Sequence, residues 1–160
     1  MSRLEPETLP KEDSIIFRDS SLFRQDATRR NLPPPEEVRA QVKASAFTHR
    51  RGTVLFSELG LVVKFGDKTS VVEGQTLWAL QHAGIGIPVP EVYGWCKDNE
   101  ETFIYMKYLP YKTLEDRWVC LGHDDRVHTC RQLHDIYSRL RTLEQEPTDA
   151  FIGKINILAS

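Results

Sequence analysis

The chain has 160 residues, of which 40% are hydrophobic and 28% are charged, and its formal net charge at pH 7 is -2. This balance is typical of a soluble globular protein that can bury a core. The small negative charge argues against a surface that binds nucleic acid or an anionic membrane. The widely spaced cysteines, without a C-x-x-C pair, and the polar N-terminus indicate a cytoplasmic protein with no zinc site and no membrane span.

The first 32 residues are polar and contain only short apolar pieces, which predicts a flexible N-terminal arm. Three prolines follow at 33–35. Val38, Val42 and Ala46 then recur at four-residue spacing, which predicts a short amphipathic helix over about 36–46.

The middle of the chain predicts a small sheet that carries one helix. Residues 53–56 and 61–65 are rich in β-forming side chains and predict a hairpin. Residues 71–83 predict a helix that ends at Gly84, and the two prolines within 86–90 predict an extended linker. Two further strands are expected over 91–96 and 102–109.

Helices are expected after the sheet, a short one over 113–118 and a long one over about 124–143. The long helix has one apolar stripe, formed by Val127, Cys130, Leu133, Tyr137 and Leu140. The order of helix, two strands, helix, two strands and further helices predicts an α+β fold.

A strand lysine and a helix glutamate form the first candidate site. Lys64 shares a strand face with Val62, and Glu73 lies near the start of the next helix, on the same stripe as Leu77 and Leu80. A carboxylate on an apolar stripe needs a partner, so we expect it to pair with Lys64 in a cleft under the sheet. Kinases hold a lysine against nucleotide phosphates with such a pair. The alternative is an exposed lysine and a glutamate that merely favours a helix start.

The run from Ile104 to Leu109 is the second candidate. Where such a strand leaves the sheet, its backbone groups can hydrogen-bond an adenine edge while apolar neighbours cover the ring. The alternative is an ordinary buried strand.

Six motifs together resemble a known family. They are, in chain order, Arg50-Arg51-Gly52, Leu61-Val-Val-Lys-Phe-Gly66, Glu73, Ile87-Pro-Val-Pro90, Phe103-Ile-Tyr-Met-Lys-Tyr108 and Thr113-Leu-Glu-Asp-Arg-Trp118. Over about 33–153 the chain resembles the aminoglycoside phosphotransferase and choline-kinase-like superfamily, especially its fungal branch. The resemblance implies a protein-kinase-like N-terminal lobe at 33–110 and the first helices of a truncated helical lobe at 111–160. It also implies ATP with Mg²⁺ as cofactor, and transfer of the γ-phosphate to a hydroxyl of a small molecule.

The resemblance also implies roles for individual residues. Lys64 would contact the phosphates, Glu73 would orient it, and Gly52 would lie near the loop that covers the phosphates. Val62 would belong to the same cofactor site, and Met106, Lys107, Tyr108 and Leu109 would form the hinge. The chain has no G-x-G-x-x-G motif, and Lys107 stands where an acidic residue is expected.

The catalytic loop of such enzymes, H-x-D-x-x-x-x-N, is missing from the sequence. His123-Asp124-Asp125 has the first spacing, but Cys130 stands in place of the asparagine, so we interpret these acids as a helix start. Cys130 and His134 share a helix face, yet a buried cysteine and a surface histidine are expected there rather than a metal site. A truncated gene model, a splice form and a degenerate copy all remain open.

Two functions remain open. The chain is either a member of a phosphotransferase family that is inactive by itself, or a non-catalytic module that binds nucleotide or a partner protein. The apolar stripe of the last helix predicts self-association.

Overall fold

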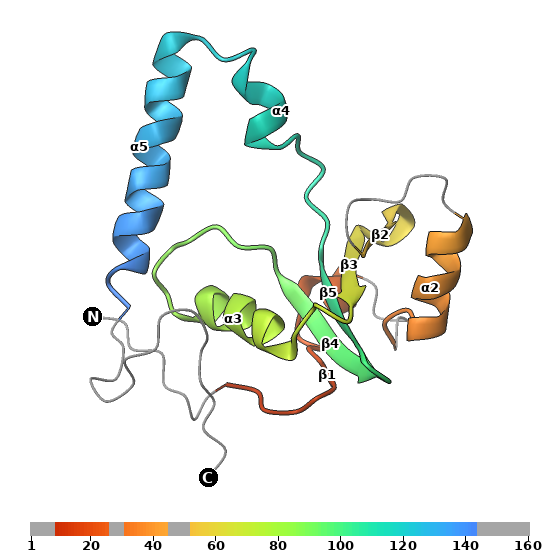
Figure 1. Cartoon of the computed structure of the whole chain (residues 1–160). Helices are drawn as coiled ribbons and strands as arrows, with labels where there is room; N and C mark the ends of the chain where they lie inside the picture. Colours follow the sequence, from red (N-terminus) through yellow and green to blue (C-terminus); the bar gives the residue numbers. More distant parts are fainter. Residues whose placement is uncertain (1–8, 26–30, 45–51, 144–160) are drawn as a thin grey trace.

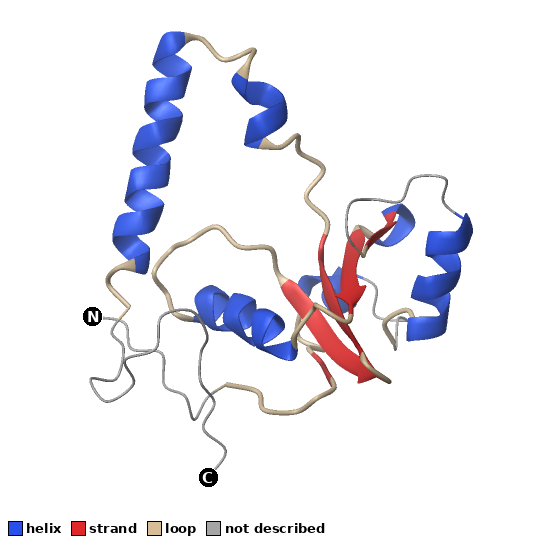
Figure 2. Ribbon diagram, viewed as in Figure 1, coloured by secondary structure: helices blue, strands red, loops and turns tan. Residues whose placement is uncertain are grey.

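The described part of the chain, residues 9–25, 31–44 and 52–143 of this computed structural model, is organised around a five-stranded sheet (Figure 1 and Figure 2). The strands are Ile15–Ile16 (β1), Thr53–Phe56 (β2), Leu61–Gly66 (β3), Val92–Asp98 (β4) and Glu101–Lys107 (β5). Their order is β1-β4-β5-β3-β2, and every neighbouring pair is antiparallel. The predicted α+β class is therefore confirmed.

Both predicted hairpins are present. β2 and β3 are joined by the 3₁₀ turn Ser57–Leu59 (η2) and by Gly60, whose φ of 57° is a left-handed conformation that glycine adopts without strain. β4 pairs with β5, and β5 also pairs with β3, so the two hairpins form one continuous surface. The last strand ends at Lys107, slightly before the predicted end.

Alternation along β3 separates two apolar clusters on opposite faces of the sheet. Leu61 and Val63 face α1 (Ser21–Gln25) and α2 (Pro35–Ala44), whereas Val62 and Lys64 face α3 (Val71–His82). The first cluster comprises Leu22, Phe23, Leu32, Val38, Val54, Leu61, Val63, Tyr93, Phe103 and Tyr105, and the second comprises Val71, Val92, Trp95 and Ile104. The sheet thus lies between α3 and the two N-terminal helices.

The helix predicted over 36–46 is confirmed as α2, up to Ala44, after which the chain lies outside the described residues. Arg39 joins this helix to the turn between β4 and β5. Its guanidinium lies 2.6 Å from an Asp98 carboxylate oxygen and 2.7 Å from one of Glu101, and it lies over the Phe103 ring. One side chain therefore fixes α2 to the end of the hairpin.

The prediction of a flexible arm over 1–32 is wrong for residues 9–25. β1 pairs with β4, with Ile15 opposite Trp95, and Leu22 and Phe23 are buried in the first cluster. The apolar pieces of this segment are too short to give a periodic signal, and their partners lie far along the chain. Residues 1–8 and 26–30 of the predicted arm lie outside the described part.

Two helices follow the sheet, α4 (Leu114–Trp118) and α5 (His123–Leu140), and confirm the two predicted helices. Thr113 caps α4 through a reciprocal capping box with Asp116. In Figure 1, α5 lies apart from the sheet, and none of its residues is buried. Near its end, Arg139 Nη1 donates a hydrogen bond of 2.9 Å to the carbonyl oxygen of Gly86.

The three cysteines are expected to react at different rates. Burial raises the pKa of the Cys96 thiol, which also lies 3.7 Å from the Tyr105 hydroxyl, whereas Cys120 and Cys130 are exposed. A raised pKa leaves less of the reactive thiolate at any given pH. A disulfide reagent at pH 8 should modify Cys120 and Cys130 quickly and Cys96 more slowly. Cys96→Ser should remove only the slow phase, and three equal rates would contradict the packing.

Candidate functional site

Lys64 and Glu73 meet at the α3 face of the sheet, as the sequence predicts. The Lys64 ammonium donates to Glu73 Oε1 across the gap between β3 and α3. Ser70 caps the start of α3, because its hydroxyl accepts from the Val72 amide at 3.2 Å and its carbonyl accepts from the Glu73 amide at 2.9 Å. This cap fixes the first turn of α3, and therefore the position of the glutamate.

The pair is more open than expected. The side chains of Lys64 and Glu73 are 39% and 38% exposed, so the carboxylate is not forced into a pair by burial. An ion pair at this exposure contributes little to stability, on the order of 0–1 kcal/mol. The exposure instead leaves the Lys64 ammonium accessible to a ligand, with Glu73 fixing its direction.

Gly74 explains how α3 comes close enough to the sheet. A Cβ at this position would lie 2.9 Å from Cε3 of the Trp95 ring, which is too close for the two atoms to coexist without a shift. Trp95 is 1% exposed and has little room to move. Only glycine after Glu73 allows this close approach. The glycine was visible in the sequence, but its partner on β4 was not.

Two predicted residues of the cofactor site continue the surface beside Lys64. Val62 lies directly opposite Met106 in the pairing of β3 with β5, and Lys64 lies opposite Ile104. Because facing residues in adjacent strands point to the same side, these four side chains form one patch on the α3 face. Val62 and Lys64 thus share a face, as predicted.

The predicted hinge residues lie where the chain leaves the sheet. The Lys107 amide donates to the Glu91 carbonyl and the Tyr108 amide donates to the Gly60 carbonyl, each at 2.8 Å. Leu109 is 49% exposed, and its amide has no partner among the described residues. Of the predicted hinge amides, that of Leu109 is free to bind a ligand.

Gly52 lies at the opposite end of β3 from the hinge. Its φ is 67°, its carbonyl accepts from the Phe65 amide at 2.7 Å, and a Cβ would lie 2.1 Å from the Phe65 carbonyl oxygen. Glycine is therefore required here for both its conformation and its close contact. The next residue, Thr53, is opposite Lys64. The preceding residues 45–51 lie outside the described part.

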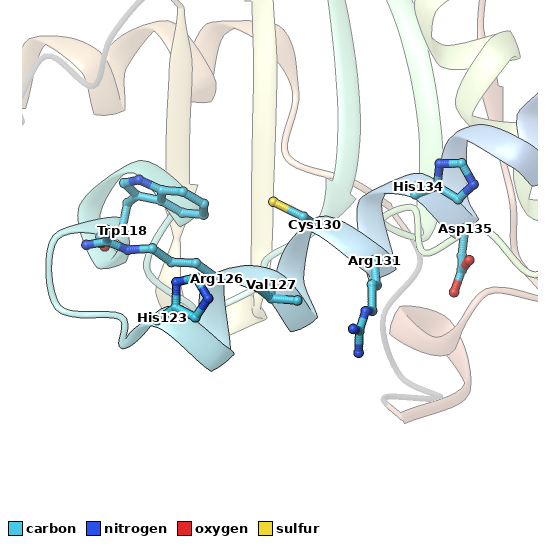
Figure 3. A pocket seen from close by; sticks show the side chains of 8 residues that line it. All are labelled: Trp118, His123, Arg126, Val127, Cys130, Arg131, His134 and Asp135. Atoms are coloured by element: carbon cyan, nitrogen blue, oxygen red, sulfur yellow. The ribbon is translucent and has the colours of Figure 1, made fainter.

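His123 and Cys130, from the stretch that has part of the catalytic-loop spacing, line a surface hollow of about 560 Å³ beside α4 and α5 (Figure 3). Its lining residues are Trp118, His123, Arg126, Val127, Cys130, Arg131, His134 and Asp135. Arg126 lies over the Trp118 ring, 5.4 Å from its centroid, and donates to the Trp118 carbonyl at 3.1 Å. Neither Lys64 nor Glu73 lines this hollow.

The acids at the start of α5 are exposed, as expected for a helix start. Cys130 is exposed, so the prediction of a buried cysteine is wrong, because no other described element covers α5 closely enough to bury any of its residues. No group of three or more potential ligands that could hold a metal ion is found in the described part of the chain. Nor does any helix among those residues have the length and apolar character to cross a membrane.

Comparisons with protein-family models, with curated proteins and with solved structures find no match to this chain.

The large hydrophobic side chains that are exposed in the described part of the chain all lie in one stretch. They are Tyr108, Leu109, Tyr111, Leu114, Trp118, Val119, Leu133 and Tyr137. Exposed apolar surface of this extent favours association.

A double-mutant cycle should detect the ion pair. Lys64→Met, Glu73→Gln and the double variant should give a coupling energy of about 0.2–1 kcal/mol in urea unfolding, and it should fall as salt is added. Lys68→Met, an exposed lysine in the turn after β3, should show no coupling to Glu73→Gln. Equal coupling for both lysines would contradict the geometry.

The purified chain should self-associate through these exposed hydrophobic side chains, because a second copy is the only partner in a purified sample. Light scattering should give a mass that rises with concentration above the 18.4 kDa monomer. Leu133→Lys with Tyr137→Lys should move the mass towards the monomer, because lysines on this face resist burial. The control is Gln132→Lys, which adds a lysine at another exposed position of α5 and should leave the mass unchanged.

Proposed function

We propose that the α3 face of the sheet binds a nucleotide, with Lys64 contacting its phosphates and Glu73 holding the lysine. The observation that carries the proposal is the ion pair between β3 and α3, with both side chains still more than one-third exposed. In kinases the equivalent lysine of a sheet strand pairs with a helix glutamate and contacts the phosphates. A lysine that served only to stabilise the helix would gain little at this exposure.

The order of groups along β3 matches the shape of a nucleotide. At the hinge end of β3, Leu61 pairs with Lys107. The next residue of β3, Val62, pairs with Met106, and Lys64 lies two residues further along the strand. At about 3.3 Å per residue, three residues separate the hinge end from the lysine by about 10 Å. A base could thus bind at the hinge and its phosphates at the lysine.

The polar groups at the two ends suit these two parts of the ligand. The free amide of Leu109 can donate to a base edge, and the apolar side chains of Val62 and Met106 can cover one ring face. At the other end, Gly52 keeps the backbone of the β2 start close to β3 without a side chain in the way. ATP therefore fits the residues present better than a ligand without phosphates.

The described residues offer no comparable site for Mg²⁺. Glu73 is engaged by Lys64, and no cluster of potential ligands is found among the described residues. The described residues therefore do not form a site for this ion.

The proposed family function is transfer of the γ-phosphate to a hydroxyl of a small molecule, as in aminoglycoside phosphotransferase- and choline-kinase-like enzymes. A second candidate is a module that binds nucleotide without turnover. Cys130 favours the second, because it stands where the catalytic loop would have asparagine and lies on the exposed α5. In this proposal Lys64 and Glu73 bind and orient the phosphates, and among the described residues we assign no group that accepts the proton of an acceptor hydroxyl.

Calorimetric titration with ATP and with adenosine tests the phosphate contact. Lys64→Met should weaken ATP binding about 10- to 100-fold, the loss expected for charge-assisted hydrogen bonds, and should leave adenosine binding unchanged. Arg39→Met removes a helix-to-sheet ion pair on the other face and should change neither.

Equal losses for ATP and adenosine would mean that Lys64 supports the fold and not the phosphates. Absence of ATP binding by the unaltered chain would overturn the proposal. Incubation with Mg-ATP and a panel of aminoglycosides, choline and sugars separates the two candidates, and product that disappears in Lys64→Met would establish the enzyme.

A further inference from the structure

Residues 9–25, which we call the strap, lie across β4 and contact α3. Three hydrogen bonds join it to β4: the Phe17 amide donates to the Tyr93 carbonyl at 2.9 Å, the Lys97 amide to the Asp13 carbonyl at 3.2 Å, and Trp95 Nε1 to the Glu12 carbonyl at 2.9 Å. One joins it to α3, where Gln75 Nε2 donates to the Pro10 carbonyl at 2.7 Å. Lys97 also forms an ion pair of 2.8 Å with Asp13. The strap is therefore fastened at several points along its first half.

One of these contacts reaches the residue next to Glu73. The strap holds the Trp95 ring through the Glu12 carbonyl and through Phe17, whose ring packs edge-on at 5.3 Å between centroids. The Trp95 ring also lies against Gly74 of α3. A ring that turned or withdrew would remove the surface on which this helix turn rests.

A second contact acts on α3 directly. Gln75 is 3% exposed, and its side-chain amide donates to the strap at Pro10. Without this acceptor the buried amide would lose its hydrogen bond, which destabilises the docked arrangement of strap and helix. The start of α3, which carries Glu73, is thus fixed by two contacts, that of Gly74 with Trp95 and that of Gln75 with Pro10.

The far end of the strap is fixed as well. The Ser21 amide donates to Glu91 Oε1 at 2.7 Å, and the Ser21 hydroxyl donates to the other carboxylate oxygen. Phe17 stacks on Trp78, which lies further along α3. The strap therefore contacts α3 at Gln75 and again about one turn further on, at Trp78.

We propose that the strap is a positioning device for Glu73: its docking on Trp95 and Gln75 holds α3 where Glu73 meets Lys64, and release of the strap weakens the pair. If the proposed nucleotide function holds, strap docking also raises the affinity for phosphates. By linkage, a bound nucleotide then stabilises the docked strap to the same extent.

The first test needs no nucleotide. The Lys64 and Glu73 coupling energy is measured by the double-mutant cycle in a Gln75→Leu background, which keeps the side-chain size and removes the donor to Pro10. Coupling should fall by half or more. In an Arg39→Met background, which breaks contacts on the other face, it should be unchanged. A merely structural role would lower stability in both backgrounds without changing the coupling.

Unchanged coupling in Gln75→Leu overturns the proposal. If that variant does not fold, Lys97→Met replaces it, since it removes the exposed ion pair to Asp13 and leaves the core intact. A coupling that is unchanged in Lys97→Met, although the Phe17 amide now exchanges rapidly with solvent, also overturns the proposal.

The second test uses ATP and adenosine. Gln75→Leu should weaken ATP binding by about fivefold or more, the lower range of allosteric coupling, with adenosine little affected. ATP should in turn slow hydrogen exchange at the Phe17 amide, which is bonded to Tyr93. If the unaltered chain binds no ATP, the proposed function fails while the coupling test still decides on the strap. If ATP binds equally to both proteins, the link between strap and nucleotide is wrong.

Discussion

The contact between the Trp95 ring and the backbone of Gly74 sets the distance between α3 and the sheet. The ion pair at the centre of the candidate site depends on that distance, because a lysine on β3 can reach a glutamate on α3 only when the helix lies close. The contact consists of an aromatic ring against a residue without a side chain, so it leaves no room for adjustment. The strap contacts the same ring through the Glu12 carbonyl and the Phe17 side chain. A long-range arrangement of three segments thus underlies one local ion pair.

Stability and function are carried by different groups in this fold. Two apolar clusters on opposite faces of the sheet supply the hydrophobic burial, and their fully buried members include Trp95, Phe103 and Leu61. The ion pair lies beside the second cluster and adds little to stability at its exposure. Because the fold does not depend on the pair, the lysine can exchange part of its contact with Glu73 for contact with a ligand without unfolding the sheet.

Local patterns predicted much of the fold and the centre of the candidate site. Strand alternation placed Val62 and Lys64 on one face, and the start of the next helix placed Glu73 opposite, because both signals act over a few residues. The strap was missed for the opposite reason. Its strand has two residues, and Ile15 pairs with Trp95, so no local pattern marks it. The role of Gly74 and the exposure of Cys130 likewise depend on which segment lies, or does not lie, against them.

Glu91 contacts both the strap and the hinge. Its side chain accepts hydrogen bonds from Ser21 of the strap, and its carbonyl accepts from the Lys107 amide at the start of the hinge. Any residue at this position could accept the backbone hydrogen bond from Lys107. The hydrogen bonds from Ser21 require two carboxylate oxygens on a side chain as long as that of glutamate. Pro88 and Pro90 restrict the preceding backbone, so it cannot shift to compensate for a shorter side chain. Tolerance to substitution should therefore be narrow at a position that, from its place in a proline-rich linker, would look replaceable.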